Sequence, residues 1–251
     1  MPSCVADSHR DADRETCFMN ILVTGGAGYI GSHACKALAQ EGYTPVSYDN
    51  LVYGHRWAVR WGPLEEGDIA DRVRLDAVIQ RYRPAAVMHF AAYAYVGESV
   101  QNPGKYYRNN VAGSLALLEA LRDRGIDKLI FSSTCATYGV PEQTPIDEQH
   151  PQRPINLGNG QGFSVHEVIE QAKSVTGKRI PVEIGPRRPG DPARLVGDAS
   201  RIRRALGWQP EYADLASILA TAWRWHTSRW EARTSPVSNG SAARQAGPTC
   251  S

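Results

Sequence analysis

A glycine-rich stretch near the amino terminus limits the possible folds of this chain more than any other feature. Residues 24–31 read TGGAGYIG, follow an apolar run and open a helical pattern. Gly25 permits a tight turn from strand to helix, Gly28 lets the backbone approach a diphosphate, and Gly31 lets the helix lie close to a sheet. The amino end of that helix attracts the anion. The stretch therefore predicts an α/β sheet that binds a dinucleotide.

A carboxylate after the second predicted strand narrows the choice of dinucleotide. Asp49 ends that strand 18 residues after Gly31. A carboxylate at this position accepts hydrogen bonds from ribose hydroxyls and repels a 2′-phosphate. It favours NAD over NADP. The alternative interpretation is an ordinary turn in which Asp49 only caps a helix.

Apolar runs and helical patterns alternate after the glycine loop, which is typical of a Rossmann-type, doubly wound parallel sheet. Strands are predicted at residues 21–24, 45–48, 64–66, 86–90 and 128–132. Helices are predicted at residues 29–40, 72–82 and 106–124, the last with an apolar stripe of Val111, Leu115, Leu118 and Leu121.

The alternation stops after Asn156. Ser164 and Glu167 have the spacing of a capping box, and the helix that follows should end at Gly177. Two more helices are predicted at residues 199–206 and 215–225. We expect a Rossmann domain at 19–156, truncated at one edge of its sheet, a small mixed carboxy-terminal lobe at 157–226 and a flexible tail at 227–251. Residues 1–18 are a disordered extension or follow a start codon assigned too early; Met19 favours the second.

Composition argues against several classes of protein. With 28 basic and 26 acidic residues, the net charge is +2, so nucleic acid and anionic membranes are poor partners. The five cysteines are widely spaced without a CxxC pair, which argues against a disulfide scaffold and a zinc site; no metal is expected. Residues 1–18 lack the apolar core of a signal peptide, so we expect a cytoplasmic location.

Longer stretches resemble the extended short-chain dehydrogenase/reductase superfamily and, within it, the UDP-glucose (galactose) 4-epimerase family. The strings TGGAGYIGSH, YDNL, GDI, HFAAYAYVGESV, YYRNNVAGS and FSSTCATYGVPEQTPIDEQHPQRPIN cover residues 20–156 almost continuously. A second block, from NLGNGQGFSVHEVI to RRPGDPARLVGDASRIRRALGWQP, is similar to the carboxy-terminal lobe of the same enzymes.

The resemblance implies an isomerase that interconverts UDP-galactose and UDP-glucose in galactose metabolism, through a 4-keto intermediate and with NAD as cofactor. It implies that Thr134 faces the sugar as a catalytic residue and that Arg188 and Asp191 hold the UDP part of the substrate. The residues that it implies for NAD are Gly25, Gly28, Tyr29, Ile30, Gly31, Asp49, Asn50, Asp68, Ile69, Phe90, Ala91, Ala92 and Asn110.

Two residues argue against a related chemistry. Sugar 4,6-dehydratases of this superfamily carry an Asp-Glu pair directly after the equivalent of Thr134, because loss of water needs a separate acid and base. This chain has Cys135 and Ala136 there. Dehydratase activity is therefore not expected.

The residues that carry the proton in this family are missing. The family has Pro-Tyr-Gly-x-x-Lys directly after Pro-x-Asn, and the Lys lowers the pKa of the Tyr, which is about 10 when free. Here Gly158 and Gly162 stand at the positions of Tyr and Lys. Tyr93, Tyr95 and Tyr138 are the alternative bases, but none has a Lys four residues later.

The two family blocks meet at one residue. Asn156 completes Pro-Ile-Asn of the first block and begins Asn-Leu-Gly of the second. The stretch that the family has between them, with the catalytic helix and the next strand, is absent. We interpret this as a single internal excision, from either a genomic deletion or a gene-model error.

Three interpretations stay open at this level. The chain is an inactive UDP-glucose 4-epimerase by descent, a non-catalytic NAD-binding remnant, or an epimerase of another UDP-sugar such as N-acetylglucosamine or glucuronate. The family resemblance also implies a homodimer formed through helices beside the sheet. Part of that interface belongs to the missing stretch, so the oligomeric state stays open.

Overall fold

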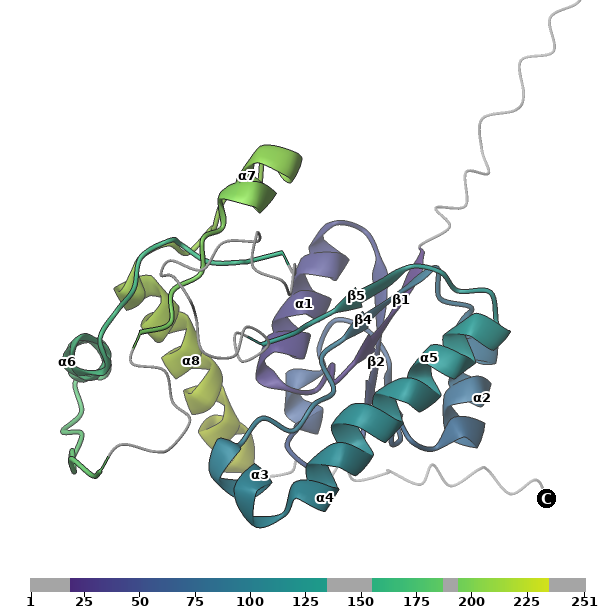
Figure 1. Ribbon diagram of the computed structural model, residues 1–251, viewed down its shortest axis with the longest axis horizontal. Helices are drawn as coiled ribbons and strands as arrows, with labels where there is room; N and C mark the ends of the chain where they lie inside the picture. The colour runs from purple at the N-terminus through teal and green to yellow at the C-terminus, as the bar shows by residue number, and fades with distance from the viewer. Residues whose placement is uncertain (1–18, 135–154, 187–193, 235–251) are drawn as a thin grey trace, which may run out of the picture. The chain divides into compact units, whose positions relative to one another are not determined.

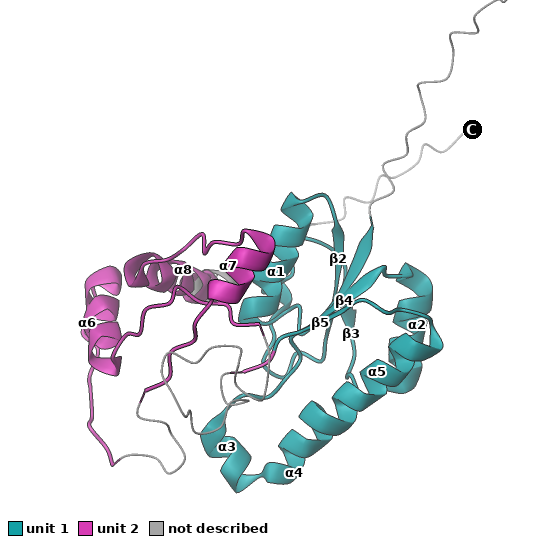
Figure 2. Cartoon of the chain, turned by 45° about the horizontal axis from the view of Figure 1, so that its top comes forward, with its two compact units in different colours: residues 1–132 teal, residues 133–251 magenta. Residues whose placement is uncertain are grey.

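The chain forms two compact units that divide after Ser132 (Figure 2). The computed structural model describes residues 19–134, 155–186 and 194–234. The division precedes the boundary predicted at residue 156, because the first unit ends directly after its last strand. Each unit is described by itself.

A parallel five-stranded sheet forms the centre of the first unit (Figure 1). Its order is β3-β2-β1-β4-β5, with every neighbouring pair parallel. The strands are β1 (Asn20–Thr24), β2 (Thr44–Asp49), β3 (Leu64–Glu66), β4 (Ala86–His89) and β5 (Leu129–Phe131). The order reverses at β1, so the crevice between neighbouring connections opens above the carboxyl end of this strand.

Helices cover both faces of this sheet. The first unit contains α1 (Tyr29–Gln40), η1 (Arg56–Ala58), α2 (Arg72–Tyr82), α3 (Val96–Gln101), α4 (Pro103–Tyr106), η2 (Tyr107–Gly113) and α5 (Ser114–Asp123). Successive side chains of β1 point to opposite faces. Leu22 packs in a cluster with Leu75 of α2 and Leu117 of α5, whereas Val23 packs with Cys35 of α1. The Rossmann-type fold is thereby confirmed.

The predicted helix at 106–124 is wrong in its start and in its buried face. The helical segment begins at Pro103, whose preceding Asn102 side chain caps it, and passes through a π-helical stretch, η2, before α5. The π turn changes which side chains face the sheet. Of the expected stripe, Leu121 is buried, while Val111, Leu115 and Leu118 are exposed; the buried residues of α5 are Leu117, Ala120 and Leu121.

The described residues of the second unit form helices α6 (Val165–Thr176), α7 (Ser200–Leu206) and α8 (Leu215–Thr234) and contain no strand, so the mixed lobe is not seen in them. The capping box is confirmed, since Ser164 and Glu167 each accept from the other's backbone N–H, and Gly177 ends α6 with φ of 63°. Contrary to the predicted flexible tail, α8 continues beyond residue 227. The hydroxyls of Thr227 and Ser228 bond back to carbonyls of the preceding turn, which keeps them compatible with a helix.

The sheet ends at β5 within the described part of the chain. Ile130 and Phe131 of this strand are 60% and 55% exposed. A parallel strand in an α/β protein is ordinarily covered on both faces. The exposure of two large apolar side chains agrees with the expected truncation at this edge.

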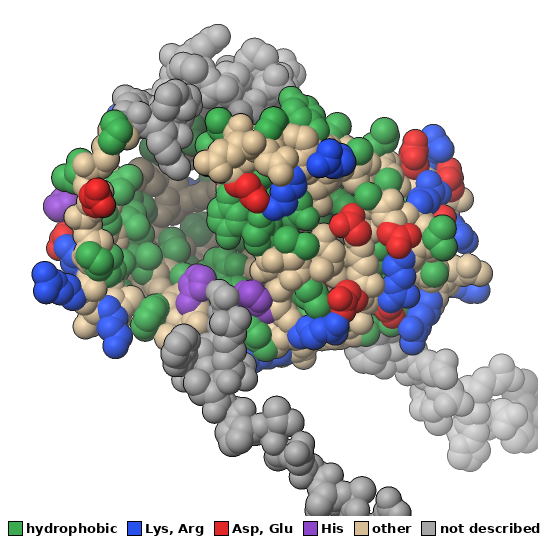
Figure 3. Space-filling view, turned by 90° about the horizontal axis from the view of Figure 1, so that it is seen from below, with side chains coloured by type: hydrophobic (Ala, Val, Ile, Leu, Met, Phe, Trp, Pro, Cys, Tyr) green, Lys and Arg blue, Asp and Glu red, His purple; other side chains and the backbone are tan. Residues whose placement is uncertain are grey.

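Charged residues are mixed on the face shown in Figure 3. Basic and acidic side chains alternate over the side that carries α2 and α5, without a patch of one sign. Arg72 of α2 there forms ion pairs with Asp76 and with Asp123 of α5. No helix among the described residues combines the length and apolar character needed to cross a membrane.

A buried histidine joins the ends of two central strands to α5. The Nδ1 atom of His89 lies 2.6 Å from the hydroxyl of Thr24, and Nε2 lies 3.0 Å from the hydroxyl of Ser114. Burial lowers the pKa of His89 to about 4. The neutral ring can donate at one nitrogen and accept at the other, and both hydroxyls can take the complementary role. His89 therefore fixes the end of β4 directly below the segment that lines the crevice.

This histidine should make the stability of the first unit pH-dependent. Its pKa is lower in the folded chain than the ordinary value of about 6.5, so the stabilisation is complete above pH 6.5 and is lost as the pH falls toward 4. A shift of this size corresponds to about 3 kcal/mol. Urea unfolding at a series of pH values should show this loss in the native chain and a shallower slope in His89→Gln. The control is His33→Gln, at an exposed position of α1, which should keep the native slope; an identical slope in His89→Gln would contradict the assignment.

Candidate cofactor site

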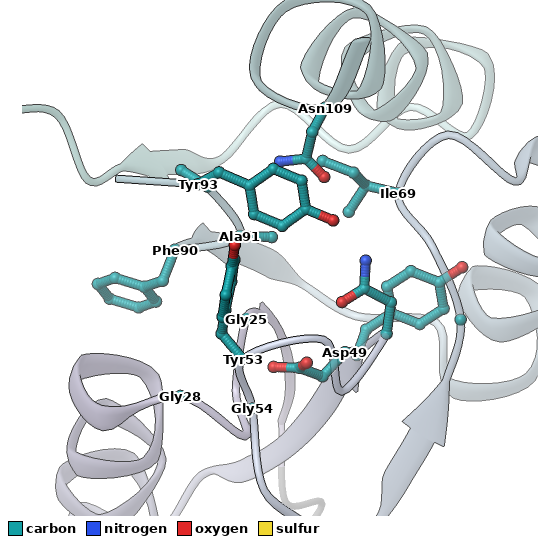
Figure 4. Close-up of a pocket in the computed structure, with 14 residues that line it drawn as sticks. Gly25, Gly28, Asp49, Tyr53, Gly54, Ile69, Phe90, Ala91, Tyr93 and Asn109 are labelled. Atoms are coloured by element: carbon teal, nitrogen blue, oxygen red, sulfur yellow. The ribbon is translucent and has the colours of Figure 1, made fainter. Parts of the chain in front are cut away.

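A crevice opens above the carboxyl ends of β1, β2 and β4 (Figure 4). The segments after these three strands supply its walls. The crevice is lined by Gly25, Gly28, Tyr48, Asp49, Asn50, Tyr53, Gly54, Gly67, Ile69, Phe90, Ala91, Ala92, Tyr93 and Asn109. Its floor is the glycine loop after β1.

The glycine loop has no space for side chains. Gly25 has a φ of 74°, and a Cβ there would lie 2.7 Å from the carbonyl carbon of Phe90. A Cβ on Gly31 would lie 2.1 Å from the carbonyl oxygen of Gly25. The helix α1 begins after Gly28 without a side-chain cap. The loop thus presents backbone and the positive end of a helix, which suits a diphosphate.

Asp49 is held rigidly at the edge of the crevice. Its Oδ2 accepts a hydrogen bond from the N–H of Ala27 at 3.0 Å, and its Oδ1 accepts one from the N–H of Leu51 at 2.8 Å. Burial raises the pKa of Asp49, although both backbone donors act in the opposite direction. A Cβ on Gly54 would lie 2.6 Å from Oδ1, so only glycine fits against the carboxylate. The carboxylate can still accept a ribose hydroxyl, because each oxygen has more than one acceptor site.

Two of the predicted residues support the walls instead of lining them. The Asn110 amide binds the backbone of Tyr93 twice: Oδ1 accepts from its N–H and Nδ2 donates to its carbonyl, both at 2.9 Å. Asp68 accepts a hydrogen bond from the Asn50 side chain at 2.9 Å. These contacts fix the segment after β4 and join the segments after β2 and β3.

The structure brings most of the predicted cofactor residues to one crevice. Those that line it are Gly25, Gly28, Asp49, Asn50, Ile69, Phe90, Ala91 and Ala92. Those outside its lining are Tyr29, Ile30, Gly31, Asp68 and Asn110. The side chains of Tyr29 and Ile30 are exposed on the first turn of α1, while Gly31 lies below the loop.

Sequence reasoning missed several lining residues. Tyr53 and Gly54 follow Asp49 closely, so their distance from a strand end could have indicated them. Tyr93 was considered only as an alternative base. Asn109 lines the crevice where Asn110 was expected, because Asn110 is turned to the Tyr93 backbone.

The predicted substrate residues lie outside the first unit. Thr134 is exposed and belongs to the second unit. Arg188 and Asp191 lie outside the described residues, as does Tyr138. The chain contains no Tyr that is followed four positions later by Lys.

The residues of the crevice fit a dinucleotide with a free 2′-hydroxyl. The bare glycine loop would take the pyrophosphate, and the buried Asp49 would take the adenosine ribose. When bound, NAD supplies a hydride acceptor. The residues around it hold and orient this group.

Comparison with known proteins agrees with this geometry. Residues 21–179 match the NAD dependent epimerase/dehydratase family. The UDP-glucose 4-epimerase of Rhizobium meliloti is 35% identical, with 84% of this chain and 98% of that protein covered. The crystal structure of UDP-glucose 4-epimerase from Brucella ovis in complex with NAD is 33% identical and superposes with a TM-score of 0.75, covering 82% of this chain and 98% of that one.

These alignments contain a large gap on the side of this chain. The alignment with the Rhizobium meliloti protein runs over 321 positions, whereas 84% of 251 residues is about 211. About 110 positions of the alignment therefore have no residue of this chain. The alignment with the UDP-glucose 4-epimerase of Rhizobium leguminosarum bv. trifolii has a similar excess, with 317 positions and 82% of this chain.

A bare glycine loop, a buried carboxylate at the end of β2 and the matched length agree with one another. This chain belongs to the NAD-dependent epimerase/dehydratase family of the extended short-chain dehydrogenase/reductase superfamily, where its relatives are UDP-glucose 4-epimerases.

Proposed function

We propose that this chain binds NAD as a UDP-glucose 4-epimerase by descent, without the acid–base pair that epimerisation needs. The observation that carries the proposal is the intact crevice of the first unit in a chain that has no Tyr-x-x-x-Lys sequence. Every residue that lines the crevice lies before residue 110. Cofactor binding therefore needs nothing from the second unit, whereas removal of the sugar hydroxyl proton needs a base that the chain lacks.

The absence of the base is best explained by a single excision at Asn156. About 110 alignment positions without a residue of this chain support a loss of this size. Local packing supports the position: the Asn156 side chain donates to the carbonyl of Asp198 at 3.2 Å, and that of Asn159 donates to the carbonyl of Ala213 at 2.9 Å. Asn156 thus packs with the second block, as expected if it originally belonged there.

Sequencing of genomic DNA and transcript across codons 154–160 tests the excision. The expected result is an uninterrupted joint in both. An intervening stretch of about 110 codons containing Tyr-x-x-x-Lys would contradict the proposal, since it would restore the catalytic pair to the native protein.

Turnover should be absent in the chain as given. Loss of a general base typically costs 10²–10⁴-fold in rate, and Gly158 offers no group in its place. Purified chain incubated with NAD and UDP-galactose should form no UDP-glucose above the buffer blank, measured by chromatography. The Rhizobium meliloti relative, assayed in parallel, is the active control. Conversion at a rate near that of the control would show that another residue serves as base.

Asp49 should set both the affinity for NAD and the preference over NADP. In Asp49→Asn the ribose loses a charged acceptor, and the repulsion of a 2′-phosphate disappears. We expect NAD affinity to fall about tenfold and the NAD-to-NADP preference to shrink by a larger factor, measured by titration calorimetry. Asp123→Asn, at the far end of α5, is the matched control and should bind like the native chain. An unchanged preference in Asp49→Asn would contradict this role.

A further inference from the structure

Tyr53 is bonded to two helices that lie far from it in the sequence. Its hydroxyl donates to Oε2 of Glu98 in α3 at 2.8 Å and accepts from Nζ of Lys105 in α4 at 2.9 Å. The ring also packs edge-on against Tyr93 and Tyr95, with centroid distances of 5.2 and 5.1 Å. Both ends of the Tyr53 side chain are therefore fixed.

Glu98 collects the contacts of this cluster. In addition to the Tyr53 hydroxyl, it accepts from Lys105 at 2.5 Å and from the Tyr106 hydroxyl at 2.7 Å. These donors, with Lys105 first, lower the pKa of Glu98 to about 2. The carboxylate is thus charged at neutral pH and remains an acceptor for all three groups. Lys105, which a reading of the sequence alone would place on a helix surface, instead lies over the rings of Tyr53 and Tyr93.

The sheet order determines what this cluster crosses. Tyr53 follows β2, while Tyr93, Glu98 and Lys105 follow β4. The strand between β2 and β4 is β1, whose carboxyl end carries the glycine loop. A contact from the β2 side to the β4 side must therefore pass above this loop. Figure 4 shows the Tyr53 side chain extending from beside Gly54 toward Ala91 and Tyr93.

The remaining space beside Tyr53 is small. The cavity measures about 90 Å³, whereas pockets for small molecules and cofactors usually measure roughly 300–1,000 Å³. A dinucleotide that is to reach the glycine loop must move a side chain that crosses the crevice. Tyr53 is the side chain that joins the two walls.

We propose that Tyr53, held by Glu98 and Lys105, is a strap that closes over the pyrophosphate of the bound dinucleotide and limits its release. This inference rests on the proposed binding of NAD. The strap must open for the cofactor to enter or leave, which breaks the hydrogen bonds of the Tyr53 hydroxyl. Once the cofactor is bound, those bonds reform and slow its dissociation. Glu98 and Lys105 are positioning residues, because they act through Tyr53.

Stopped-flow fluorescence of NADH with the full 251-residue chain tests the strap. Tyr53→Phe keeps the ring and removes the bonds, Glu98→Gln removes the charge, and Lys105→Met removes the donor. We expect NADH dissociation to become about tenfold faster in Tyr53→Phe, the change that one hydrogen bond to a charged group supports, and association to rise by less. The other two variants should change in the same direction.

Tyr43→Phe is the matched control, because this tyrosine lies just before β2 at the opposite end of the sheet. It should keep the native rates, and thermal unfolding of each variant shows whether the fold is intact. Dissociation within twofold of native in all three strap variants would overturn the strap while leaving NAD binding in place. Tighter binding by Tyr53→Phe would also overturn it, since the ring would then compete with the cofactor. A native chain that binds no NADH would overturn the proposed function itself.

Discussion

The close approach of two backbones is the constraint on which the rest of this structure depends. The turn after β1 and the segment after β4 lie so close together that a Cβ on Gly25 would overlap Phe90. The same loop lies against Gly31, which brings α1 onto the sheet. Because no side chain separates these segments, the floor of the crevice consists of backbone. An anion can then reach the amino end of α1, and the carboxylate of Asp49 is left as the group that distinguishes one dinucleotide from another.

Binding and chemistry are divided between different parts of this chain. The first unit holds the whole lining of the crevice, the histidine that fixes β4 and the cluster around Glu98. The proton chemistry of the relatives would need a phenolate, and no residue in the sequence matches its motif. A loss centred on Asn156 removes one function without touching a residue of the other. The exposed side chains of Ile130 and Phe131 mark where the sheet lost its covering.

The sequence predicts those features that depend on local pattern. The strands, the capping box at Ser164 and the end of α6 at Gly177 follow from short runs of residues and agree with the structure. The buried face of α5 could not be predicted, because a π turn shifts the helix and is not visible in apolar spacing. The continuation of α8 past residue 227 was missed for a related reason: Ser and Thr favour loops on average, but here their hydroxyls bond within the helix.

The contacts of Tyr53 were beyond sequence reasoning because they join residues that are 45 and 52 positions apart. Asn110 shows the same limit at shorter range: its amide was expected at the cofactor but binds the Tyr93 backbone instead. Residue type and strand order could place these side chains near the crevice. Their direction depends on the geometry of the π turn and of the connections after β2 and β4.

The position of the crevice along the chain has a consequence for how the protein is made. All lining residues, and all strands of the sheet, come before Ser132, and the joint at Asn156 follows them. Domains generally fold as units during synthesis, with the amino-terminal one first. The ribosome therefore completes the cofactor-binding unit before it translates the joint. The nascent chain can form this unit without any information about what the gene has lost downstream.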